Sequence, residues 1–287
     1  MRSLHPSEPE NESTMRILLP TDTSALALEA AVYAVKLSKK INAEFILFHS
    51  DPTPRPSYSF VNKLDDLIES EAIAALDKCV EQIKEESGVD VKIKTAFRFG
   101  DPIFAINLYA KEEEVDLIIM GTKGETVIKN RLFGSVASGL LESTVVPTLF
   151  YPINTDAGFP MSIAFPTDLT NIDEEIEELI AFAQFFDARI DVIHIYPDMV
   201  DESSFDEERT RLQLIANTSY PHITFSAVKN SDIISGIHEY VQSDNPDMIC
   251  MFTYKSGILE HLFQTSYTTE MTFQSTKPLL ILRKPSF

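Results

Sequence analysis

Short apolar runs alternate with helical stripes along the chain, and this alternation is the main signal of its fold. Residues 17–19 and 45–48 are apolar runs of strand length, and the first of them ends in a turn-forming Pro-Thr-Asp. Between them lies a stripe with the i, i+3, i+4, i+7 spacing of an amphipathic helix, formed by Leu28, Ala31, Val32 and Val35. The pattern predicts strands joined by helices, as in a parallel sheet that is covered on both faces.

The same alternation continues to about residue 151. A second helical stripe covers residues 76–83, and alternating positions over 91–97 predict a third strand. A third helix is predicted to begin at Asp101-Pro102, because Asp suits the N-cap and Pro the first helical position. The remaining predicted elements are a strand over 115–120, a helix over 135–143 and a strand over 146–151. Five strands with right-handed connections favour a doubly wound sheet with the strand order 3-2-1-4-5.

The chain contains this unit twice. Its repeated segments are 16–22 and 162–168, 43–49 and 188–194, and 116–122 and 247–253. The second copy is shorter, mainly because 38 residues lead from His194 to Asp232 where 52 lead from His49 to Asp101. A shortened helix explains this difference. We therefore expect an α/β protein with two tandem doubly wound domains, each a five-stranded parallel sheet with helices on both faces.

The repeats also suggest where the domains begin and end. We expect residues 15–152 and 161–287 to form the two domains. Residues 153–160 are expected to link them, because Asn, Asp, Gly and Pro gather there. Residues 1–14 are polar and are expected to form a disordered tail.

Composition and charge exclude several classes of function. The chain has 287 residues, of which 44% are hydrophobic and 24% are charged, and this is typical of a soluble globular protein. Its net charge is −20, with −13 in residues 153–287, so we expect neither nucleic acid nor a membrane surface as a partner. The two Cys have no metal-binding spacing, and the polar N-terminal segment does not look like a secretory signal. These features lead us to expect a cytoplasmic protein.

The predicted fourth strand of the first copy runs into a glycine-containing loop that suits anion binding. Gly121 and Gly124 lie at the start of this loop, and Gly134-Ser135 opens the helix that follows. Glycine lets the backbone approach a ligand closely, and the free N–H groups at a helix start favour a phosphate. The Ser135 hydroxyl can cap the helix or donate to a phosphate oxygen. The same glycines also suit ordinary turns and caps, so their spacing alone leaves both interpretations open.

The position of the loop favours the ligand site. In open α/β sheets, ligands bind beyond the carboxyl ends of the strands, where the strand order reverses. With the order 3-2-1-4-5, strands one and four are neighbours at that reversal. Asp22 follows strand one and Gly121 ends strand four, so both are expected to face one crevice.

At these positions the sequence resembles the universal stress protein family. The nucleotide signature of that family is a glycine, two residues, a glycine, nine residues, a glycine and then Ser or Thr. This sequence matches the signature without a gap at Gly121, Gly124, Gly134 and Ser135. The Pro20-Thr21-Asp22 strand ending, His49 and the turn at residues 100–102 are also similar. The resemblance covers nearly all of residues 15–287 as a tandem pair.

The resemblance implies a site for ATP, or a related adenine nucleotide, with Mg²⁺ in the first domain. Asp22 is implied to lie near the ribose and to bind the metal, and Ser50 to lie near the adenine. The implied binding residues are Pro20, Thr21, Asp22, Ser50, Met120, Gly121, Thr122, Lys123, Gly124, Gly134, Ser135 and Val136. Lys123, Lys129 and Arg131 add positive charge there or are simply solvated loop residues. The resemblance also implies that the two domains pair within the chain, or that two chains pair as a homodimer.

The second copy departs from this pattern. Its aligned residues are Phe252 for Gly121, Lys255 for Gly124 and Gln264 for Gly134, and only Thr265 matches Ser135. A Phe side chain at the strand end would fill the space that a phosphate needs. Asp168 remains, but an Asp after a strand is equally well explained as a turn residue. We therefore predict a degenerate, empty second site.

Two classes of function remain open. The first is an ATP-binding stress-response or regulatory protein, with at most slow ATP hydrolysis, since no paired carboxylates, Ser/His/Asp set or Walker lysine stand out. The second is a scaffold that binds no nucleotide and acts through protein contacts. His49 and His194, which end equivalent strands, are expected to be structural histidines. Cys79 and Cys250 are expected to be core residues.

Overall fold

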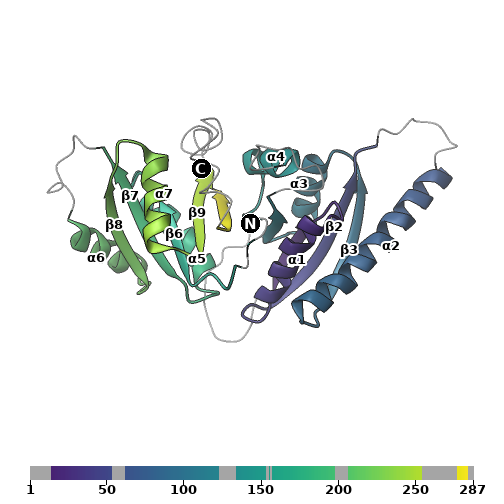
Figure 1. Cartoon of the computed structure of the whole chain (residues 1–287), viewed down its shortest axis with the longest axis horizontal. Coiled ribbons are helices and arrows are strands. Elements are labelled where there is room, and N and C mark those ends of the chain that lie inside the picture. The colour runs from purple at the N-terminus through teal and green to yellow at the C-terminus, as the bar shows by residue number, and fades with distance from the viewer. Residues whose placement is uncertain are drawn as a thin grey trace. The chain divides into compact units, whose positions relative to one another are not determined.

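The chain folds into two compact units that divide between residues 153 and 154. The computed structural model describes residues 14–53, 62–122, 134–152, 155, 157–197, 206–253 and 277–283. Figure 1 shows a sheet flanked by helices in each unit. Apart from Thr14, the expected N-terminal tail lies outside the described residues.

The first unit is a five-stranded parallel sheet. Its strands are β1 (Met15–Pro20), β2 (Ala43–Asp51), β3 (Ile93–Phe99), β4 (Leu117–Gly121) and β5 (Thr148–Tyr151). They lie in the order β3-β2-β1-β4-β5, and every neighbouring pair is parallel. Its helices are α1 (Ala25–Leu37), α2 (Asn62–Ser87), α3 (Pro102–Glu112) and α4 (Ser135–Ser143). Helices α1 and α2 pack together on one face of the sheet, and α3 and α4 on the other. The predicted fold class and strand order are confirmed for this unit.

Local sequence signals explain where several of these elements begin. The Asp101 carboxylate accepts a hydrogen bond from Phe104 N at 3.1 Å, so it caps α3 as predicted. Helix α4 has the predicted bounds. Strand β3 begins later than predicted, because its pairing with β2 starts with Ile93 opposite Phe45 and leaves Val91 outside the ladder. The predicted stripe of α2 is buried at Leu76, Cys79, Val80 and Ile83.

The second unit repeats this architecture. Its strands are β6 (Ser162–Pro166), β7 (Arg189–Tyr196), β8 (Ile223–Lys229), β9 (Met248–Thr253) and β10 (Leu279–Arg283). They lie in the order β8-β7-β6-β9-β10, again with parallel neighbours. Its described helices are α5 (Ile172–Ala183), α6 (Glu207–Thr218) and α7 (Ile233–Asp244). Helix α6 has 12 residues where α2 has 26, which confirms the predicted shortening. Within the described ranges, no helix is both long and apolar enough to cross a membrane.

Equivalent aspartates tie the start of the first strand to the start of the fourth strand in each unit. In the first unit, Asp116 Oδ2 accepts one hydrogen bond, from Arg16 N at 2.8 Å. In the second unit, Asp247 Oδ2 accepts three, from Met161 N at 3.1 Å and from the backbone N and the Oγ of Ser162 at 3.0 Å each. The stability of the second unit therefore depends more on Asp247 than that of the first unit depends on Asp116.

This difference gives a prediction for stability. Asp247→Ala is expected to lower the free energy of unfolding by about 1–3 kcal/mol, because it removes three acceptor contacts at once. Asp116→Ala is expected to cost about 1 kcal/mol, because it removes one. Urea unfolding followed by circular dichroism measures both changes. A larger loss in the Asp116 variant would contradict the interpretation.

Candidate functional site

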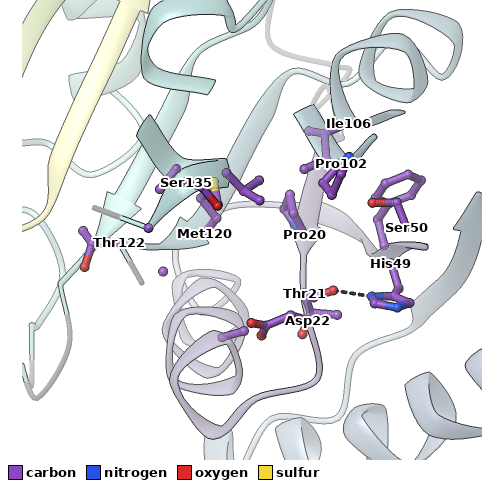
Figure 2. Close-up of a pocket in the computed structure, with 16 residues that line it drawn as sticks. Pro20, Thr21, Asp22, His49, Ser50, Pro102, Ile106, Met120, Thr122 and Ser135 are labelled. Carbon is purple, nitrogen blue, oxygen red and sulfur yellow. Dashed lines mark hydrogen bonds between the residues drawn. The ribbon is translucent and has the colours of Figure 1, made fainter. Parts of the chain in front are cut away.

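A pocket opens at the carboxyl ends of β1, β2 and β4 in the first unit, as Figure 2 shows. Ten of the twelve residues predicted as binding residues line it: Pro20, Thr21, Asp22, Ser50, Met120, Gly121, Thr122, Gly134, Ser135 and Val136. The other two, Lys123 and Gly124, lie outside the described residues, as do Lys129 and Arg131. The structure thus gathers residues from four separate chain segments around one pocket. Their contacts with a ligand stay a prediction.

Six further residues line the pocket without having been predicted to bind. They are Ala27, Phe48, His49, Pro102, Ile106 and Ala137. Pro102 and Ile106 lie four residues apart on α3, so they share the helix side that meets the strand ends. That spacing was the available sequence signal, but it becomes informative only once α3 is placed over β2.

A tight turn after β1 places Asp22 at the pocket. Thr21 Oγ1 accepts a hydrogen bond from Thr23 N at 2.9 Å. Asp22 Oδ1 accepts from Ser24 N at 3.1 Å and from Ser24 Oγ at 2.5 Å. Thr23 has a φ of 64°, a left-handed conformation that is costly for a β-branched residue. These contacts hold the exposed Asp22 carboxylate at one edge of the pocket.

The second unit contains the same turn. Thr167 Oγ1 accepts from Leu169 N at 3.0 Å, and Asp168 Oδ1 accepts from Thr170 N at 2.8 Å. Leu169 has a φ of 66°, as Thr23 has 64°. The turn is therefore a property of the repeated fold, and it does not by itself define a ligand site.

His49 and His194 hold equivalent strand ends together. His49 Nδ1 lies 2.8 Å from the carbonyl oxygen of Thr21, and His194 Nδ1 lies 3.1 Å from that of Thr167. A carbonyl oxygen only accepts hydrogen bonds, so Nδ1 carries the proton in both rings. The bond occurs in both units and joins neighbouring strand ends, which confirms the prediction of structural histidines.

Helix α4 begins at the pocket without a side-chain cap. Gly134 N donates to Thr122 O at 2.8 Å and closes the base of the loop, and Gly134 is the N-cap of α4. Glycine has no side chain that could accept a hydrogen bond. The first N–H groups of α4, which belong to Ser135 and the residues after it, therefore have no side-chain cap among the described residues. The equivalent groups of α1 are capped by Ser24. These donors, which no described side chain caps, and the helix dipole make this end of the pocket suitable for an anion.

At the equivalent strand ends of the second unit, larger side chains replace Gly121 and Ser50. Phe252, which aligns with Gly121, is 6% exposed, and its ring packs against Phe165 with 5.6 Å between centroids. Ile195, which follows His194 as Ser50 follows His49, packs against α7 at Gly236. A Cβ added to Gly236 would come within 2.8 Å of Ile195 Cγ2, so the absence of a side chain there makes room for the isoleucine. The aligned residues Lys255, Gln264 and Thr265 lie outside the described residues.

Both cysteines are buried, which confirms them as core residues. Burial raises the pKa of the Cys79 thiol, and it raises that of the fully buried Cys250 thiol well above its usual value. Neither thiol is therefore activated as a nucleophile.

Comparison with known proteins identifies the family of the chain. The model of the Universal stress protein family matches residues 14–152. Universal stress protein MJ0531 of Methanocaldococcus jannaschii is 35% identical over 138 residues, which are 47% of this chain and 79% of that protein. Universal stress protein MJ0577 of the same organism is 31% identical over 150 residues, 47% of this chain and 92% of that protein. The chain belongs to the universal stress protein family.

A solved structure shows the same fold over nearly the whole chain. The crystal structure of a universal stress protein from Archaeoglobus fulgidus covers 94% of this chain and 97% of its own, with a TM-score of 0.70. The two sequences are 18% identical, so this likeness concerns the fold.

The left-handed residue of the turn gives a second prediction. Thr23→Asn is expected to raise the free energy of unfolding by about 1 kcal/mol, because Asn tolerates this conformation better than Thr. Leu169→Asn, at the equivalent position, is expected to act in the same direction. Thermal unfolding of the two single variants measures the effect, and a lowered midpoint in both would show that the turn stores no strain.

Proposed function

We propose that the first unit binds ATP, or a related adenine nucleotide, and that the protein is a nucleotide-regulated stress-response protein. The observation that carries this proposal is that the start of α4, which no described side chain caps, lines the same pocket as Asp22. The glycine spacing that resembles the family signature supports it, and so does membership of the family.

The pocket has a polar and an apolar part that suit the two ends of a nucleotide. In the proposed pose, the phosphates lie against Gly121 and the N–H groups at Ser135, because a helix start stabilises negative charge. The adenine lies near Ser50. Pro102, which is half-buried, lines the pocket together with Ser50 and offers apolar surface to the base.

A magnesium ion fits the proposed site through Asp22. No group of three His, Cys, Asp or Glu side chains in the described ranges is placed to hold a metal ion by itself. Mg²⁺ does not need one, since it is usually bound by one or two carboxylates together with phosphate oxygens and water. When bound, it would neutralise phosphate charge beside the Asp22 carboxylate.

The second unit is proposed to bind no nucleotide. Phe252 and Ile195 occupy the places of Gly121 and Ser50, and both pack against their own unit. The remaining Asp168 belongs to the turn that both units share. The second unit would then act through packing and protein contacts. We propose in addition that it pairs with the first unit, or that two chains pair as a homodimer.

A scaffold that binds no nucleotide is the alternative function. Two observations favour it for that half of the chain: Phe252 and Ile195 stand in place of Gly121 and Ser50, and residues 153–287 carry a charge of −13. For the first unit, nucleotide titration decides between the two functions. Hydrolysis of ATP is expected to be slow at most.

Substitution of the glycines tests the nucleotide site. Gly121→Val and Gly134→Val are each expected to raise the Kd for ATP with Mg²⁺ at least about 100-fold, or about 2.7 kcal/mol, because the added side chain enters the phosphate space. Gly158→Val is a matched control, since a Cβ there meets nothing within 4 Å. Calorimetric titration of nucleotide-free protein measures all three variants. Unchanged affinity in both pocket variants would overturn the proposal.

The two equivalent aspartates test which unit binds. Asp22→Ala is expected to weaken ATP binding in the presence of Mg²⁺ more than in its absence, because it removes the proposed metal ligand. Asp168→Ala is expected to leave both the affinity and the stoichiometry of one nucleotide per chain unchanged. A fall in stoichiometry on changing Asp168 would show that the second unit binds as well.

A further inference from the structure

Helix α2 continues well beyond the core that it covers. Among its described side chains, which begin at Leu64, the first buried one is Leu76. In Figure 1 the N-terminal end of α2 reaches past the strands of its sheet. About three turns of this helix therefore make little contribution to the core of the first unit.

The repeat shows that the fold does not require this extension. Helix α6 packs on α5 and β8 in the second unit, as α2 packs on α1 and β3 in the first. It does so with 12 residues where α2 has 26. The additional turns are a feature of the first unit alone and call for a different explanation.

The extension carries its own apolar stripe. Leu64, Leu67 and Ile68 lie at i, i+3 and i+4, and the two leucines are 58% and 52% exposed. Each residue turns a helix by about 100°, so Leu64 lies about 120° around the axis from Leu76. Leu67 lies about 180° from Leu76 and Ile68 about 80°, so the stripe is turned away from the buried face by different amounts along its length. Because both leucines are more than half exposed, packing against the sheet does not account for them.

Acidic residues surround this stripe. Asp66, Glu69 and Glu71 are exposed, and within the described part of the chain no basic side chain forms an ion pair with any of them. The segment thus offers apolar anchors together with unneutralised negative charge. This combination favours a partner that is apolar at its centre and basic at its rim.

We propose that residues 64–71 of α2 form a docking surface for a partner protein whose contact site is an apolar groove flanked by Lys and Arg. Leu64 and Leu67 are the anchors that enter the groove, as in other helix-in-groove complexes, and the carboxylates meet the basic rim. The charge disfavours the other occupants. An anionic membrane would repel this segment, and a second copy would bring its own carboxylates against these ones. The surface is distinct from the nucleotide pocket, so the proposal stands independently of nucleotide binding.

A cationic amphipathic peptide serves as the probe for this surface. A labelled helix of three heptads, with Leu at the a and d positions and Lys elsewhere, presents an apolar seam between basic flanks. Fluorescence anisotropy is expected to show that the full chain binds it. The double variant Leu64→Gln/Leu67→Gln is expected to weaken binding at least about tenfold. Gln retains helix propensity, so circular dichroism is expected to show an unchanged helix content and melting temperature.

The counterpart helix supplies the matched control. Leu212 of α6 is also 52% exposed, and Leu212→Gln is expected to leave peptide binding unchanged. Asp66→Lys/Glu69→Lys is expected to weaken binding, with the loss largest at low salt. The proposal would be overturned if Leu64→Gln/Leu67→Gln bound the peptide as tightly as the wild type. It would also be overturned if Leu212→Gln weakened binding as much as the double variant does. A wild-type dimer in sedimentation that the leucine variant dissociates would assign the stripe to a second copy and would also overturn it.

Discussion

The parallel pairing of β1 with β4 is the constraint on which the site depends. Ile17 lies opposite Leu117 and Leu18 opposite Ile118, so the two strands end side by side. The chain leaves β1 for a helix on one face of the sheet and enters α4 on the other face after β4. The strand ends therefore open into a pocket instead of being covered by a helix, and it is there that Asp22 and the start of α4 meet.

The duplication separates what the fold requires from what a ligand would require. Both units have the strand-end turn, the left-handed residue within it and the histidine bond to a threonine carbonyl, so these features hold strand ends together in any copy. The units differ at Gly121 and Phe252, and at Ser50 and Ile195. Those positions line the pocket in the first unit and are packed with side chains in the second. The two halves thus share a fold and differ in the residues at their strand ends.

Much of the fold could be predicted because its signals are local. The bounds of α4, the Asp101 cap and the shortened α6 depend on residues only a few positions apart, or on chain lengths that the repeat makes comparable. Most of the pocket-lining residues were predicted as well, since glycines and polar residues at strand ends must gather once the strand order is known. Strand ends do not follow from local signals alone, as the late start of β3 shows, because pairing with a neighbouring strand decides them.

By itself, the sequence determined the two α/β copies, their strand order and the difference between their glycine positions, since periodicity, capping and spacing are written along the chain. Only the tertiary structure decided which side chains fill or leave space. The Ile195 side chain fits because Gly236, which is distant in sequence, has no Cβ, and Pro102 and Ile106 line the pocket because α3 crosses β2. The exposure of Leu64 and Leu67 likewise depends on where the sheet ends beneath α2. Such contacts join elements that are far apart along the chain, and no local pattern encodes the distance between them.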